Sequence, residues 1–310
     1  MASTSSNNNS FVMITRRTRV QELIARFNAW SQAKFYLEHN HIDVQDYLDE
    51  HEVYLEQIKK AEGFLRQQGR FQRIDRDMLP SYQFGTDDIV VVVGQDGLVA
   101  NSLKYLDAQP VIGINPDTER FDGVLLPFTV KELQPVVQAV IAKSITTKEV
   151  TFAKVETNDG QSMRAVNDFF IGPKSHTSAR YTLRWNGQEE TQSSSGIIVS
   201  TGFGSTGWFQ SVLAGAMGVT GAVEHAMKSG FDWDAERLQF AVREPFPSQT
   251  SRAGVVFGEI NASSPFALES HMPENGVIFS DGIESDFIQF NAGTIARISV
   301  DEQKGRLVVA

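Results

Sequence analysis

The sequence predicts two domains of different classes, a Rossmann-like α/β domain followed by a β-sandwich. In residues 11–143, apolar strand-like runs alternate with helical runs, which is typical of a parallel sheet with helical crossovers. From residue 144 to residue 310, short strands follow one another, and Asp-Gly and Asn-Gly turns separate them. The last of these strands is a candidate to return to the first domain.

The clearest strand of the first domain is Ile-Val-Val-Val-Val at 89–93. Its uninterrupted β-branched residues are typical of a strand that is buried on both faces. The helical runs around it have apolar residues on one face and capping residues at their ends. Two further strands are expected at 11–15 and 111–114. Helices are expected near 20–27 and over 43–68, the second with Asp43 as its cap and Gly69 at its end. Another helix is expected to open with the capping box Thr129–Glu132.

Hairpin signals organise the second domain. Strands at 149–156 and 162–171 flank the turn Asn158-Asp159-Gly160, and a strand at 181–185 runs into Asn186-Gly187. One helix, roughly 208–228, interrupts the β-rich pattern. The remaining strands are expected at 254–260, 276–280, 287–290, 295–300 and 306–309.

Composition excludes several classes of function. The 310 residues carry a net charge of −10 without long basic runs, so nucleic acid and anionic membranes are poor partners. The absence of cysteine excludes disulfides, thiol catalysis and Cys-based metal sites. No run approaches the ~18 apolar residues of a membrane span. Residues 1–10 are Ser- and Asn-rich, so we expect a disordered tail, no signal peptide and a cytoplasmic protein.

The turn after the 89–93 strand carries the first candidate site residues, Gly94, Asp96 and Gly97, ahead of a helical run. Backbone N–H groups at a helix N-terminus attract anions, and glycine lets a ligand approach the main chain. An acid there is repelled by phosphate unless it holds Mg²⁺ or accepts a hydroxyl proton. Taken alone, this turn is also consistent with ordinary α/β structure.

Three further segments favour a phosphate or nucleotide site. Asn115 ends the neighbouring strand, at the edge where open α/β sheets bind ligands. The pair Asn167-Asp168 offers the donor and acceptor atoms that two ribose hydroxyls require, although such pairs are also common in surface turns. The segment after residue 196 is too rich in glycine and hydroxyl residues for an ordinary hairpin. Its candidate ligand-lining residues are Thr201, Gly204, Ser205, Thr206 and Trp208.

Taken in order, these segments resemble the NAD kinase family over about 85–310. The family's Gly-Gly-Asp-Gly motif falls on 94–97, its Asn-Glu pair on Asn167-Asp168, and its Gly-Ser-Thr loop on 200–208. The segments at 110–120, 166–172 and 194–196 are most similar to the branch that contains the mitochondrial NAD kinases.

The resemblance implies transfer of a phosphate from ATP or polyphosphate, with Mg²⁺, to the 2′-hydroxyl of the adenosine ribose of NAD. Asp96 would accept the hydroxyl proton, and Asn167 and Asp168 would orient the ribose. The loop residues 200–208 would line the dinucleotide pocket, and Trp208 would stack on a base or plug the core. The resemblance also implies a homodimer or homotetramer, and no resident metal site is predicted.

The sequence departs from the family motif at Gln95, where a glycine is usual, and at Leu98, where threonine is common. If that position needs a positive φ or contact with phosphate, Gln would cost about 1–2 kcal/mol. Two alternatives therefore stay open beside an active kinase. One is a non-catalytic NAD(P)-binding homologue with a degraded ATP site, and the other is a sugar or lipid kinase of the same superfamily.

Overall fold

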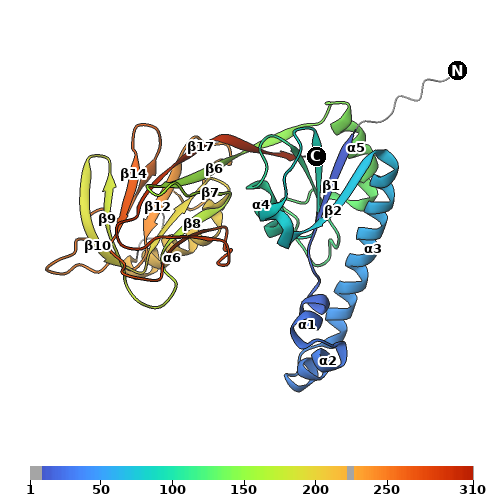
Figure 1. Ribbon diagram of the computed structural model, residues 1–310, viewed down its shortest axis with the longest axis horizontal. Coiled ribbons are helices and arrows are strands. Elements are labelled where there is room, and N and C mark those ends of the chain that lie inside the picture. The colour runs from blue at the N-terminus through green and yellow to red at the C-terminus, as the bar shows by residue number, and fades with distance from the viewer. Residues whose placement is uncertain (1–8, 222–226, 310) are drawn as a thin grey trace. The chain divides into compact units, whose positions relative to one another are not determined.

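The structure, a computed structural model, describes residues 9–221 and 227–309. The chain divides into two compact units, Met1–Lys148 with Arg306–Ala310 and Glu149–Gly305. We call them the α/β unit and the β unit. Figure 1 shows the helices and parallel strands of the first and the antiparallel strands of the second, which confirms the predicted fold class. Of the tail expected at 1–10, residues 1–8 lie outside the described residues, and Ser10 already begins a strand.

The α/β unit is built on a parallel sheet. The buried strand β3 (Asp88–Val93) lies at its centre and matches the predicted 89–93 strand. Short β5 (Phe128–Thr129) pairs with the end of β4. The strand order is β2 (Arg70–Asp75), β1 (Ser10–Thr15), β3, β4 (Pro110–Asn115) and the last residues of β17 (Ile295–Val308).

Helices α3 (Val44–Gln68) and α5 (Leu133–Ile141) pack on this sheet through apolar side chains such as Ile58 and Val137. Asp43 caps α3 as predicted, because its carboxylate accepts the Gln45 N–H at 2.9 Å. The predicted capping box at Thr129 is also present, and it opens a short 3₁₀ turn ahead of α5. The remaining helices of the unit are α1 (Arg19–Phe27) and α2 (Trp30–His39), which lie at the start of α3 (Figure 1), and α4 (Asp96–Leu103).

The β unit is a sandwich of two antiparallel layers. The aromatic core between the layers includes Phe169, Phe240 and Phe266. One layer contains β6 (Thr147–Thr157), β7 (Ser162–Ala165), β9 (Ala179–Trp185), β10 (Gln188–Ser194), β14 (Phe266–Ser270) and β17. The other contains, in order, β13 (Phe257–Ile260), β12 (Leu238–Val242), β11 (Ile197–Ser200), β8 (Asp168–Pro173), β15 (Gly276–Ser280) and β16 (Phe287–Gln289).

Helix α6 (Trp208–Thr220) packs on the outer face of the second layer, where Phe209 and Leu213 contact Phe170 and Ile198. The predicted helix over 208–228 is too long, because Gly221 in the left-handed conformation (φ 71°) ends it after Thr220. Residues 222–226 of that prediction lie outside the described residues.

Three predictions of strand extent are wrong. The strand expected at 254–260 begins only at Phe257. The strand expected at 162–171 is two strands, β7 and β8, which belong to different layers and are separated at Val166-Asn167. The strands expected at 295–300 and 306–309 are one strand, β17, because the polar residues between them continue the extended backbone. β17 runs to Gly305 in the β unit and ends in the α/β unit.

Tyr54 links α3 to the end of β3. Its buried hydroxyl donates to the Val93 carbonyl at 2.7 Å and accepts the Arg16 N–H at 3.0 Å, and burial raises its pKa to about 12.

We therefore expect Tyr54→Phe to lower the free energy of unfolding by about 1–3 kcal/mol, because a buried carbonyl and a partly buried N–H lose this hydrogen-bond partner. Denaturant titration measures this change. The control is Tyr82→Phe, whose exposed hydroxyl donates to Gln72 and whose loss should cost under ~0.5 kcal/mol. Equal costs for the two variants would contradict the assigned role of Tyr54.

Candidate functional site

The turn between β3 and α4 presents free backbone donors. Among the described residues, the N–H groups of Gln95, Asp96 and Gly97 donate to no acceptor in the chain. Gln95 is extended (φ −120°, ψ 165°), so this position requires no positive φ. Gly97 is exposed, and a Cβ added to it would meet nothing within 4 Å. Packing within the protein therefore does not explain why residue 97 is glycine.

The Asp96 carboxylate lies half-buried at the first turn of α4, where the helix dipole favours negative charge. Its Oδ1 accepts the backbone N–H of Leu125 at 2.6 Å. Its Oδ2 has no hydrogen bond to any residue in the described part of the chain. One oxygen is thus fixed, and the other is free to accept a proton or a ligand.

Asn115, at the end of β4, is buried and uses its side chain to shape the loop that follows. Its Nδ2 donates to the Phe121 carbonyl at 3.0 Å, and its Oδ1 accepts the Asp117 N–H at 3.0 Å. Both ends of the amide therefore have partners within the chain. A direct contact between Asn115 and a ligand stays a prediction, and it would have to replace one of these bonds.

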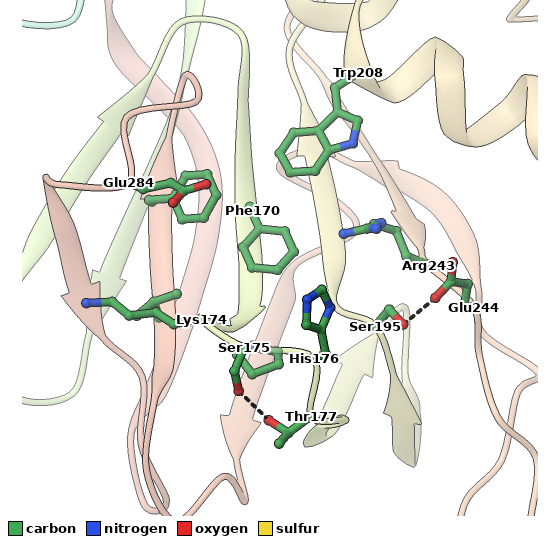
Figure 2. Close-up of a pocket in the computed structure, with 13 residues that line it drawn as sticks. Phe170, Lys174, Ser175, His176, Thr177, Ser195, Trp208, Arg243, Glu244 and Glu284 are labelled. Carbon is green, nitrogen blue, oxygen red and sulfur yellow. Dashed lines mark hydrogen bonds between the residues drawn. The ribbon is translucent and has the colours of Figure 1, made fainter. Parts of the chain in front are cut away.

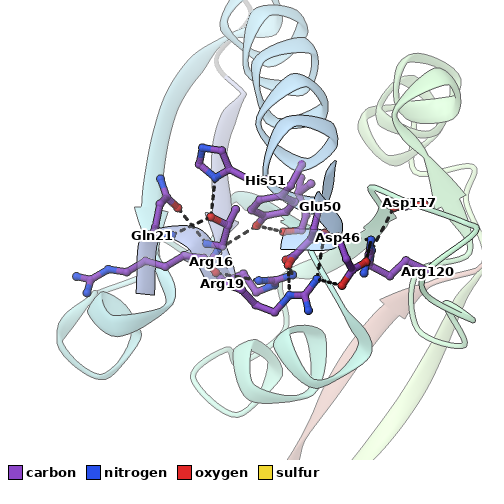
Figure 3. A network of polar contacts seen from close by, with 12 residues as sticks. Arg16, Arg19, Gln21, Asp46, Glu50, His51, Asp117 and Arg120 are labelled. Atoms are coloured by element: carbon purple, nitrogen blue, oxygen red, sulfur yellow. Dashed lines mark hydrogen bonds and ion pairs between the residues drawn. The ribbon is translucent and has the colours of Figure 1, made fainter. Parts of the chain in front are cut away.

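Charged side chains form a network beside this loop (Figure 3). Glu50 accepts from Arg16 at 2.8 Å and also pairs with Arg19. Burial opposes ionisation of Glu50, but the hydrogen bonds from Arg19 and Arg16 outweigh it and lower its pKa. Asp46 pairs with Arg120 at 2.6 Å and with Arg19 at 2.8 Å, and these two hydrogen bonds lower the pKa of Asp46 to about 2. The network therefore stays ionised at neutral pH.

In the β unit, the break between β7 and β8 places Asn167 and Asp168 side by side. The backbone N–H of Asn167 donates to Asp281 Oδ1 at 2.6 Å, and the N–H of Asp281 donates to the Asp168 carbonyl at 3.0 Å. In contrast, the side chains of Asn167 and Asp168 have no hydrogen-bond partner in the part of the chain that is described. An amide and a carboxylate are thus both available to a ligand.

Asp168 is an unusual carboxylate because it is only 6% exposed and its side chain receives no N–H or O–H from the residues that the structure describes. Burial, followed by the nearby charge of Asp281, raises the pKa of Asp168 to about 7. Buried polar groups in proteins normally have partners, and perturbed carboxylates gather at functional sites. Asp168 is therefore the strongest candidate ligand-binding acid of the β unit.

The predicted binding loop, 200–208, packs against the Asn167 segment. A Cβ on Gly204 would lie 2.1 Å from the Asn167 carbonyl oxygen, so glycine is required there. The hydroxyls of Thr201 and Ser205 donate to the carbonyls of Val166 and Gly202 and are buried. These two hydroxyls stabilise the loop, whereas the exposed Thr206 has no side-chain partner within the described ranges.

Trp208 lines a cavity of about 790 Å³ in the β unit (Figure 2). Its indole stacks on Phe170, with ring centroids 5.7 Å apart, and lies near Phe279. The Arg243 guanidinium lies 5.6 Å from the Trp208 ring, and Lys174 and His176 also line the cavity. The carboxylates of Glu244 and Glu284 line the same cavity and offset these cations, so the aromatic faces are suited to a base while the charge does not single out a phosphate.

Comparison with solved structures finds many related folds, of which two are described here. Yeast NADH kinase complexed with NADH matches with a TM-score of 0.60 and 14% identity, over 98% of this chain and 84% of that one. An NAD kinase from Archaeoglobus fulgidus in complex with ATP matches with a TM-score of 0.57 and 17% identity, over 97% and 93% of the two chains. This chain shares their fold. A scan of protein-family models and a search of curated proteins give no match.

Two residues of the site escape sequence-based prediction. Leu125 contributes only a backbone N–H, for which the sequence has no signal. Asp281 follows β15 and has a left-handed backbone (φ 56°). The sequence signal for a turn at this residue is the Asp-Gly pair at 281–282.

No three His, Asp or Glu side chains converge as a metal site in 9–221 or 227–309. No helix in those ranges has the length and apolarity to cross a bilayer.

The Asp168 environment predicts a pH-dependent effect on stability. The folded-state pKa of about 7 exceeds the ~3.9 of an unfolded aspartate, so stability is lost as pH rises through that interval. Asp168→Asn removes this ionisation, and we expect it to stabilise the free protein by ~1–3 kcal/mol at pH 8 and by almost nothing at pH 4. Thermal unfolding at both pH values measures the difference.

The matched control is Glu56→Gln. A hydrogen bond from Lys60 lowers the Glu56 pKa, so this change cannot stabilise the protein at pH 8. An Asp168→Asn effect that is the same at pH 4 and pH 8 would contradict the raised pKa.

Proposed function

We propose that this chain is a kinase of the NAD kinase family that transfers the γ-phosphate of ATP to the 2′-hydroxyl of the adenosine ribose of NAD or NADH. The observation that supports this most directly is the Asp96 carboxylate, which has one fixed oxygen and one free oxygen beside three free backbone N–H groups. The fold shared with two nucleotide-binding kinases adds to this support. The mitochondrial branch stays a prediction.

In the proposed step, Asp96 Oδ2 accepts the proton of the 2′-hydroxyl while the 2′-oxygen of the ribose bonds to the γ-phosphorus. The bond between the γ-phosphorus and the β–γ bridging oxygen breaks, and ADP leaves. Phosphoryl transfer depends mainly on positioning and charge neutralisation, so free N–H groups and the Mg²⁺ that arrives with ATP meet its needs.

The β unit supplies the proposed dinucleotide contacts. Asn167 and Asp168 hold the ribose hydroxyls, since their side chains are free and offer both donors and acceptors. The exposed Thr206 and the ring of Trp208 lie next along the loop and are proposed to contact the phosphates and a base.

The alternative of a non-catalytic NAD(P)-binding homologue depends on Gln95 and on Leu98, whose side chain is buried. Part of the reason for it disappears, because Gln95 has an extended backbone and pays no left-handed penalty. The remaining argument for a degraded ATP site is that the Gln95 side chain would take space from a donor phosphate.

Purified protein with Mg²⁺-ATP and NAD or NADH, followed by an NADP-specific dehydrogenase, tests the proposed function. Asp96→Asn keeps an oxygen for the Leu125 N–H, so we expect intact folding and NAD affinity but at least ~100-fold lower turnover. Asn167→Ala should instead weaken NAD binding by about 1–3 kcal/mol in calorimetry. Wild-type turnover that survives Asp96→Asn would show that Asp96 is not the base, and wild-type protein without NADP formation would favour the binding homologue.

Two substitutions in the turn test its contact with the donor. Gly97→Ala adds a methyl group where the protein itself has open space, so stability should hold while the KM for ATP rises several-fold, because a phosphate can no longer reach the backbone. Gln95→Gly should lower the KM for ATP and leave that for NAD unchanged. Initial-rate kinetics and thermal melts distinguish these effects, and an unchanged KM for ATP in both variants would place the donor elsewhere.

A further inference from the structure

The segment after β4 controls the Asp96 carboxylate through one backbone group. Leu125 is buried, and its N–H is the donor that fixes Asp96 Oδ1 at 2.6 Å. A shift of Leu125 would therefore rotate the carboxylate and move the free Oδ2. The position of Leu125 depends on contacts made by the residues before it.

Gly113 sets one limit on that position. A Cβ at residue 113 would lie 2.1 Å from the Leu125 carbonyl oxygen, so the loop backbone lies directly on β4. The next residue, Leu126, donates its N–H to the Gly123 carbonyl at 3.1 Å. Gly123 has φ +69°, and its backbone turns the chain back toward the sheet.

Asn115 holds the middle of the loop, residues 116–124, from the sheet side. Its amide bonds to Phe121 and Asp117 span the loop, and a Cβ on Gly123 would lie 2.6 Å from Asn115 Nδ2. The Asn115 amide is buried, and its N–H and its oxygen both bond to the loop. These bonds therefore fix the amide and the loop relative to each other.

Arg120 holds the same loop from the outside. Its guanidinium pairs with Asp46 on α3 at 2.6 Å and lies 3.6 Å from Asp117 in its own loop (Figure 3). Asp46 is also fixed by Arg19 at 2.8 Å. The loop is thus joined to α3, a rigid element 74 residues earlier in the chain.

We propose that Asn115 and Arg120 are positioning residues for the phosphotransfer, which act on Asp96 through the Leu125 N–H and do not bind the substrates. This inference rests on the proposed function for its catalytic consequence. The inference depends on three contacts within the α/β unit. Asp46 forms an ion pair with Arg120, and Asn115 forms a hydrogen bond with the same loop. The loop then reaches Asp96 through the Leu125 N–H.

Arg120→Ala is the main test, since the side chain is at the surface and its removal should leave the fold intact. We expect kcat to fall by about tenfold, because small displacements of a catalytic group are costly, while the KM for NAD and ATP and the Kd for NAD stay unchanged. Arg120→Lys keeps a cation for Asp46 and should recover most of kcat. Asn115→Ala should show the same split with a larger loss.

The matched control is Arg66→Ala, which removes another surface ion pair of α3, with Glu62 at 2.6 Å, and should leave kcat unchanged. A weaker Kd for NAD with unchanged kcat in Asn115→Ala or Arg120→Ala would overturn the proposal and make these residues ligand contacts. Wild-type kinetics in Arg120→Ala would also overturn it.

Amide hydrogen exchange at Leu125, measured by NMR, tests the same chain of contacts without any turnover. Arg120→Ala should speed exchange at Leu125 by about tenfold or more, and Arg66→Ala should not, because only the former releases the loop. Unchanged exchange in Arg120→Ala would overturn the proposed coupling. If the wild type makes no NADP, the proposed function fails, while the exchange data still decide whether Arg120 and Asn115 position Asp96.

Discussion

Close contact between two backbone segments at a glycine determines where functional groups lie in both units. A Cβ on Gly113 or Gly204 would lie 2.1 Å from the carbonyl oxygen of Leu125 or Asn167, respectively, so no side chain fits at either position. In the α/β unit, the contact places the N–H that fixes Asp96. In the β unit, it presses loop 200–208 against the segment that carries the free side chains of Asn167 and Asp168.

Carboxylates in the two units differ in how their charge is compensated. Glu50 and Asp46 each accept from two arginines, which lower their pKa, so they stabilise the folded chain at neutral pH. Asp168 has no such donor, and its pKa of about 7 means that its ionisation opposes folding. The ion pairs of Glu50 and Asp46 with arginines have a structural role, so these two acids need no ligand to explain them. For Asp168 we propose a ligand that brings hydrogen bonds, since sites of function commonly retain groups that lower stability.

Local signals in the sequence predicted what local physics determines. The apolar run of β3, the Asp43 cap and the Asn-Gly hairpin after β9 each depend on a few consecutive residues, and all three are present. β2 was not predicted, because only Ile74 of its six residues is buried. The hydroxyls of Thr201 and Ser205 suggested ligand contacts, but the partners that they find include a carbonyl 35 residues away. Asp281 reaches Asn167 across 114 residues, a distance over which the sequence pattern carries no information.

Gln95 illustrates how a motif position can be judged by its geometry. Glycine can be required because the backbone is left-handed, because another segment leaves no room for Cβ, or because a ligand approaches. The first reason does not apply at Gln95, whose φ is −120°. The second holds at Gly113 and Gly204, and within the protein it does not hold at Gly97, which faces open space. At residues 95 and 97, only the third reason is left, namely that a ligand approaches the backbone. In the proposed function that ligand is a phosphate, which needs room beside the three N–H groups that have no acceptor among the described residues. Under the proposed function, Gln95 therefore bears on donor access, since its extended backbone shows that the turn folds with glutamine there.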